Sequence, residues 1–189
     1  SCGGGKKFIK YPVDDILMQT PKDKLPMSIV LHDMDSKSSS RYLNKYKVIT
    51  NADDPVKKKE TVTPWTRVSA QDFSKNYNNM GMEIGSKKID STGKEVVSKI
   101  AAPPGYADYV GNKKYGQWKT NSSGESFWSF YGKYMFMSTM FNMALYPVRR
   151  SYYGTYRSSY YGRRPYYGGT GSRRTYGTGS RYSRSSSRS

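Results

Sequence analysis

The sequence has few of the residues that build disulfides, metal sites and hydrolytic centres. Cys2 is the only cysteine and His32 the only histidine among 189 residues. One cysteine excludes an intrachain disulfide and a cysteine-rich zinc site, and one histidine excludes a ligand set built on two. The segment His32-Asp33-Met34-Asp35 follows an apolar run, which is typical of a strand that ends in a polar turn, so we expect no metal there.

Motifs that mark an enzyme are missing as well. No G-x-S-x-G segment is present to place a nucleophilic serine on a strand-to-helix turn. Gly93-Lys94 is followed by Glu95, whereas a phosphate-binding P-loop requires Ser or Thr at that position. We therefore predict a protein that is not an enzyme, with no catalytic residue and no cofactor.

Long apolar runs and acidic residues are both scarce. Hydrophobic residues make up 35% of the chain, mean hydropathy is −0.85, and 32 Lys and Arg face 14 Asp and Glu, which gives a net charge of +18. This composition excludes a polytopic membrane protein. The length accommodates one ordinary domain with appendages, and we expect no single compact domain from end to end.

The last 43 residues, 147–189, contain no acid, no lysine and no Leu, Ile, Phe or Trp. They contain ten Arg and nine of the 19 Tyr, and their net charge is +10 against +8 for residues 1–146. Such a composition buries too little apolar surface to offset the entropy of ordering the chain. We therefore predict that residues 147–189 form a disordered basic tail.

At the other end, Ser1-Cys2-Gly3-Gly4-Gly5 is followed by Lys6-Lys7. This segment resembles the processed junction of a bacterial lipoprotein, in which a small residue precedes the lipid-bearing cysteine and a tether follows it. The resemblance implies that Cys2 carries a diacylglycerol and that residues 1–10 tether the protein to a membrane. It also implies a location in the bacterial cell envelope.

Residues 11–120 have the pattern of a small α+β body. A short helix is expected after Pro12, with acidic residues favourable in its first turn. The β-branched run 27–32 and the alternating run 42–50 predict two strands of a hairpin, joined by a long polar loop over 33–40. Ser69 predicts the start of a helix over 70–79.

The second half of the body continues this mixed pattern. Residues 82–84 indicate the start of a strand, and the turn residues of 90–94 lead to a returning strand over 95–100. An aromatic-rich stretch follows Pro103-Pro104. The fold class predicted for the whole body is therefore α+β, with a few short strands and helices.

The aromatic and methionine-rich segment 121–146 is predicted as a long helix near 123–146. Ser122 with Glu125 matches a capping box, and Pro147 with Arg149-Arg150 fits a helix end. Three interpretations stay open: a core helix, a helix in the membrane interface, or a span or oligomerisation helix. The side chains expected to contact a membrane or partner are Phe127, Trp128, Phe130, Tyr131, Tyr134 and Phe141.

Repeated Tyr-Tyr-Gly and Arg-Arg pairs make the tail a candidate binding segment. Arginine forms bidentate hydrogen bonds with phosphates, and tyrosine offers a stacking face. The predicted anion-binding residues are Arg149, Arg150, Arg157, Arg163, Arg164, Arg173 and Arg174. Possible partners by this chemistry are anionic lipid, an anionic polymer, an envelope protein or single-stranded nucleic acid.

Three functional hypotheses follow. The first is a structural or interaction lipoprotein of the cell envelope, membrane-anchored through Cys2, whose basic tail contacts an anionic partner. The second is a nucleic-acid-binding protein that uses the Arg/Tyr/Gly-rich tail. The third is a self-assembling matrix component held by Arg–Tyr contacts.

Overall fold

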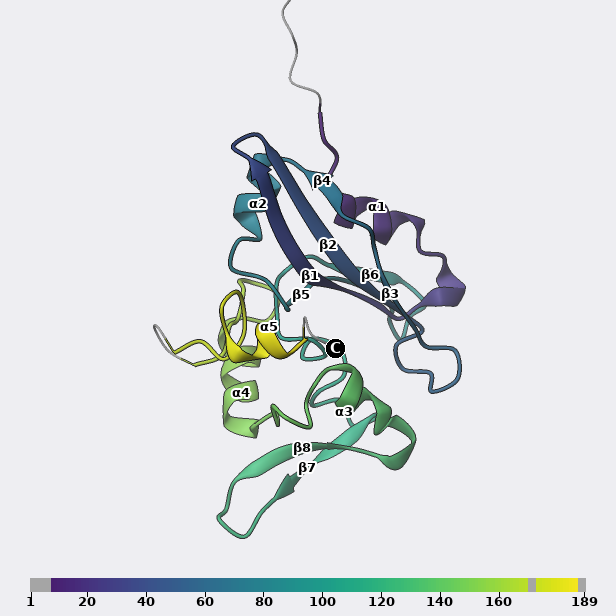
Figure 1. Cartoon of the computed structure of the whole chain (residues 1–189). Helices are drawn as coiled ribbons and strands as arrows, with labels where there is room; N and C mark the ends of the chain where they lie inside the picture. Colours follow the sequence, from purple (N-terminus) through teal and green to yellow (C-terminus); the bar gives the residue numbers. More distant parts are fainter. Residues whose placement is uncertain (1–7, 170–172, 187–189) are drawn as a thin grey trace, which may run out of the picture.

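An antiparallel sheet forms the upper part of the molecule, and loops, helices and a small hairpin pack beneath it (Figure 1). The computed structural model describes residues 8–169 and 173–186. The structure is 22% helical and 30% strand, and its strands are antiparallel, so the predicted α+β class is confirmed. Cys2 and most of the predicted tether 1–10 lie outside the described residues.

The main sheet has six strands in the order β3-β2-β1-β5-β6, and β4 also pairs with β2. Their bounds are β1 (Met27–Ser38), β2 (Arg41–Thr50), β3 (Lys59–Val62), β4 (Thr66–Val68), β5 (Glu83–Ile89) and β6 (Glu95–Ser98). The predicted hairpin of 27–32 with 42–50 is confirmed, but the long loop over 33–40 is wrong. β1 continues to Ser38 because two register irregularities, at Leu31/Asp33 and Ser36/Ser38, let the polar stretch stay paired.

Both faces of the central strands are covered, so every residue from Met27 to Leu31 is buried. On one face lies α1 (Pro12–Gln19), which begins at the predicted proline and buries Val13 and Leu17. The predicted helix 70–79 is shorter than expected, since α2 (Ala70–Lys75) ends in a turn. Its cap is the predicted one, with Ser69 Oγ accepting from the Asp72 amide at 3.0 Å.

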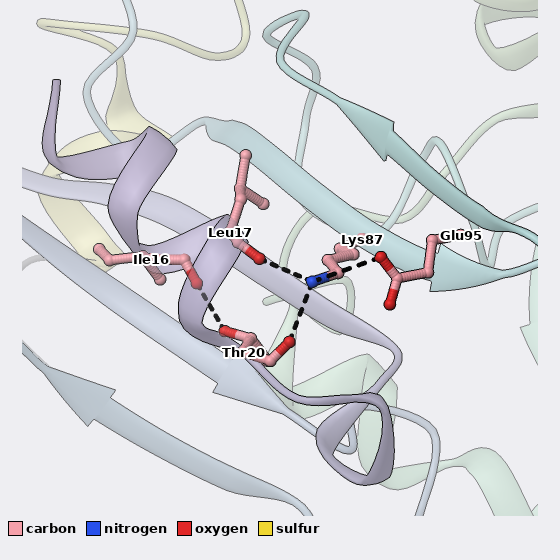
Figure 2. A network of polar contacts seen from close by, with 5 residues as sticks. All are labelled: Ile16, Leu17, Thr20, Lys87 and Glu95. Carbon is pink, nitrogen blue, oxygen red and sulfur yellow. Dashed lines mark hydrogen bonds and ion pairs between the residues drawn. The ribbon is translucent and has the colours of Figure 1, made fainter.

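A buried lysine ties α1 to the sheet (Figure 2). Lys87 on β5 is 6% exposed, and its Nζ donates to the carbonyl oxygens of Leu17 at 2.8 Å and Thr20 at 3.0 Å. A carboxylate oxygen of Glu95 lies 3.7 Å from the same nitrogen. The ammonium thus satisfies carbonyls that the end of a helix leaves without partners, and a short 3₁₀ turn, η1 (Lys22–Lys24), follows.

The predicted long helix near 123–146 is wrong. Residues 121–146 instead contribute β8 (Ser126–Phe130), which pairs with β7 (Gly116–Thr120), then η2 (Gly132–Tyr134) and α3 (Phe136–Met140). The hairpin forms because Trp118 lies directly opposite Trp128, with ring centroids 5.2 Å apart, and because Gly124 takes φ +83° in the turn. Asn121 Oδ1 accepts amide hydrogen bonds within that turn, which replaces the capping box.

The predicted disorder of residues 147–189 is also wrong for the residues that the structure describes. They form α4 (Arg150–Ser159) and α5 (Arg181–Ser186) and pack beneath the sheet (Figure 1). The tail residues with buried tyrosine rings are Tyr156, Tyr166, Tyr176 and Tyr182. The tail orders without Leu, Ile, Phe or Trp because a tyrosine ring also buries a large apolar area when its hydroxyl finds a partner.

Hydrogen bonds fix the tail to the body. Tyr106 and Tyr176 share a hydroxyl–hydroxyl bond of 3.0 Å, and the Tyr182 hydroxyl donates to the Phe141 carbonyl at 3.0 Å. The side chain of Thr178 donates to the Tyr77 carbonyl at 2.6 Å. These contacts join residues about 40 to 100 positions apart in the sequence, so no local sequence pattern could predict them.

Replacing Tyr156 tests whether the tail belongs to the core. Tyr156 is 3% exposed, so Tyr156→Ala should lower the free energy of unfolding by about 3 kcal/mol or more. Tyr152 lies on the same helix and is 53% exposed, so Tyr152→Ala should change the free energy of unfolding by about 0.5 kcal/mol or less. Urea denaturation of both variants is the measurement, and equally small effects would show that the tail does not pack.

Candidate anion-binding surface

The two residue types that dominate the tail separate in the folded structure. Its buried tyrosines point into the molecule, where the rings of Tyr156 and Tyr176 pack edge-on against Tyr106 with centroids 5.7 and 5.8 Å away. The arginines point outward. Exposed ones are Arg150, Arg157, Arg163, Arg164, Arg173, Arg174, Arg181 and Arg184, while Arg149 is half-buried. The guanidinium groups thus lie outside an aromatic layer, and we call these arginines, with the tyrosines beneath them, the Arg/Tyr surface.

Several of these guanidinium groups rest on aromatic rings. Arg157 lies 3.8 Å from the ring centroid of Tyr161, Arg164 lies 4.3 Å from that of Tyr160, and Arg174 lies 4.6 Å from that of Tyr167. Cation–π contact restricts each side chain and leaves its N–H edge available to an acceptor. The stacked arginines are therefore partly pre-organised to bind an anion.

Carboxylates are scarce on this surface. Arg149 forms an ion pair with Glu125 at 3.4 Å. Within the described part of the chain, no carboxylate lies within ion-pair distance of Arg157, Arg164 or Arg174. These three positive charges are therefore not neutralised by an ion pair with the described residues.

The aromatic residues predicted to contact a membrane or partner do not share one face. Phe130 and Phe141 are core residues with 4% and 2% exposure, whereas Tyr131 is 42% exposed. The remaining three are half-buried: Tyr134 packs on Tyr115, Trp128 on Trp118, and Phe127 beneath Arg149. The helical stripe that would have united the six residues is absent, because the segment forms a strand, a 3₁₀ turn and a short helix.

A buried polar cluster lies on the same side of the sheet as the tail. Lys88 on β5 forms an ion pair with Asp108 at 2.9 Å, and the Asp108 side chain is only 9% exposed. Glu83 is fully buried, and this burial, together with the nearby Asp108 charge, raises its pKa to about 8. At neutral pH the Glu83 carboxyl is therefore mainly protonated, and it adds little negative charge beneath the Arg/Tyr surface.

Other candidate chemistries have little support in the described residues. None of their helices has the length and apolar character needed to cross a membrane, and they contain no group of three His, Cys, Asp or Glu side chains placed to hold a metal ion. His32 is half-buried on β1, where burial and the nearby Lys47 lower its pKa. Comparison with protein-family models, curated proteins and solved structures gave no match for this chain.

The arginines of the tail stand out in the sequence, but the residues that surround them in the fold do not. Composition alone singles out the predicted arginines of the tail, because they have no acidic neighbours in sequence. It gives no indication that Lys88 and Asp108 of the body would lie beside Tyr161 of the tail, since they come together only through the sheet and a long connection. The signal that could have pointed to Lys88 is the adjacent pair Lys87-Lys88, because neighbouring residues of a strand point to opposite faces of the sheet.

The raised pKa of Glu83 predicts a pH-dependent stability. The folded protein holds the proton more tightly than the unfolded chain, so the free energy of unfolding should fall as pH rises from about 4.5 to about 8. Glu83→Gln keeps a neutral hydrogen-bonding group of similar size and should remove most of this slope.

Urea denaturation at four pH values between 5 and 8 measures the effect. Glu60→Gln is the control, because Glu60 is a surface residue that pairs with Lys47. If the free energy of unfolding of Glu83→Gln fell with pH as steeply as that of the unmodified protein, Glu83 would not be the source of the pH dependence.

Proposed function

We propose that this protein is a non-enzymatic interaction protein that binds an anionic partner through its Arg/Tyr surface. The observation that carries the proposal is the set of exposed arginines, three of them stacked on tyrosines and without a carboxylate partner among the described residues. Guanidinium groups in this state bind phosphate or carboxylate oxygens bidentately and lose little side-chain entropy on doing so.

The setting we propose is the bacterial cell envelope. The Ser-Cys-Gly-Gly-Gly segment supports a lipid on Cys2, and the body begins with α1 only about ten residues later. A diacylglycerol carries two acyl chains, which is sufficient for stable attachment to a membrane, and a basic surface adds an electrostatic contact. The Arg/Tyr surface supplies positive charge of the kind that anionic lipid headgroups attract.

Removing the stacked arginines should weaken binding to an anionic surface. The triple variant Arg157→Ala, Arg164→Ala, Arg174→Ala should bind vesicles of phosphatidylglycerol and phosphatidylcholine about tenfold more weakly than the unmodified protein and show a shallower salt dependence. Vesicle co-sedimentation at several salt concentrations is the measurement.

A matched control is the triple variant Lys57→Ala, Lys58→Ala, Lys59→Ala, which removes the same charge from an exposed run of the body. Its affinity should stay within about twofold of the unmodified protein if the effect is local. An equal loss in both variants would contradict the proposal and indicate a response to net charge alone. Tighter binding of single-stranded DNA than of vesicles would favour a nucleic-acid partner instead.

The anchor has its own test. Intact mass and N-terminal peptide mapping of the protein from its native host should show a diacylglycerol on Cys2, and a Cys2→Ala variant should leave the membrane fraction at high salt. An unmodified Cys2 behind a longer leader would remove the anchor from the proposal and leave the Arg/Tyr surface untouched.

A further inference from the structure

A small cavity of about 260 Å³ lies where β5, the 107–112 loop and α4 meet. Its polar lining comes from Lys88 on β5, from Asp108 and Asn112 on the loop, and from Tyr153, Arg157 and Tyr161 on and just after α4. The cavity is therefore built jointly by the body and the tail, which Figure 1 shows packed against each other.

The lining offers many hydrogen-bond donors and few acceptors. Within the described part of the chain, the hydroxyl groups of Tyr153 and Tyr161 have no hydrogen-bond partner, and Arg157 has no ion pair. Asn112 uses its Oδ1 to accept the Lys114 amide at 3.0 Å, which leaves its NH₂ group as a donor. The only acid in the lining, Asp108, is already paired with Lys88 at 2.9 Å.

The shape of the cavity depends on a glycine. Gly111 has φ +77°, and a Cβ at this position would lie 2.6 to 2.7 Å from the ring and hydroxyl of Tyr153. The Tyr153 ring cannot easily move aside, because it packs on Tyr106 and Trp118 with centroids 6.2 and 5.4 Å away. Only glycine lets the loop approach closely enough for this phenol to reach the cavity.

The charge balance favours an anion of one to two charges. Asp108 and Lys88 cancel each other, while the Arg157 guanidinium, held 3.8 Å from the Tyr161 ring centroid, is left uncompensated. Donors from three separate segments line the space, and this arrangement suits an anion whose oxygens point in several directions, such as a tetrahedral oxyanion.

We propose that this cavity binds the phosphoryl group of a phosphomonoester. The inference deepens the proposed function, on which it rests, by naming the site and the chemical class of the anion. A lipid headgroup and a soluble phosphomonoester carry the same group, so the test separates the two sources.

Two variants remove features of the cavity with little change to its charge. Tyr153→Phe deletes one donor and should weaken binding of glycerol 3-phosphate about tenfold, whereas Tyr152→Phe, on the exposed side of α4, should leave it unchanged. Gly111→Ala should abolish binding. Its control is Gly93→Ala, which imposes the same left-handed strain at φ +84° with no atom within 4 Å of the new Cβ. Calorimetric titration of the full chain is the measurement, with acetate as the comparison anion.

Vesicles containing phosphatidic acid in phosphatidylcholine identify the source of the phosphoryl group. Weaker vesicle binding by Tyr153→Phe, and competition by glycerol 3-phosphate, would assign the site to a lipid headgroup. If Tyr153→Phe lost glycerol 3-phosphate binding but bound vesicles as well as the unmodified protein, the site would be assigned to a soluble phosphomonoester. Either result supports the inference.

The absence of saturable glycerol 3-phosphate binding, or binding that Tyr153→Phe and Gly111→Ala leave intact, would overturn the inference. The proposed function would survive that outcome as long as the triple arginine variant still lost vesicle binding. It would fall if vesicle binding did not depend on the stacked arginines, or if the triple lysine variant lost vesicle binding equally.

Discussion

Burial of both faces of the central sheet is the constraint on which the rest of the structure depends. An antiparallel sheet usually leaves one face to water, but here β1 and β5 have covering layers on either side, and each layer must find partners for the polar groups it buries. Two neighbouring lysines of β5 do this in opposite directions. Lys87 points to α1 and binds its last carbonyls, while Lys88 points to the other layer and pairs with Asp108.

The second layer is made largely of tyrosine, and this explains how a tail without Leu, Ile, Phe or Trp can fold. Each buried ring supplies apolar area, and several hydroxyls bond to one another or to backbone carbonyls, as Tyr106 does with Tyr176 and Tyr182 with Phe141. Arginine cannot be buried at comparable cost, so it stays at the surface and stacks on the outermost rings. Folding thereby leaves the guanidinium groups exposed on the outside of an aromatic layer.

This arrangement links stability to the proposed binding. Tyr156 belongs to the core and Arg157, the next residue, to the surface, so one turn of α4 serves both purposes. Protonation of buried Glu83 at neutral pH keeps a negative charge away from the underside of the same layer. Asp108, which lines the same cavity as the stacked Arg157, is paired with Lys88 and leaves the guanidinium available.

The sequence by itself determined the α+β class, the 27–50 hairpin, the Ser69 cap and the arginines of the tail, because each depends on residues close together in the chain. Tertiary structure decided the rest. Segment 121–146 satisfied a helical pattern, yet Trp118 opposite Trp128 made part of it a strand, since pairing with a segment outside the window outweighed local propensity. The sequence predicted a disordered tail because the residues of the tail cannot form a core by themselves. The tail is ordered where Tyr106 and the 76–80 turn provide hydrogen-bond partners. The cavity beside Gly111 likewise exists only once strand, loop and tail meet, so no stretch of sequence could contain its geometry.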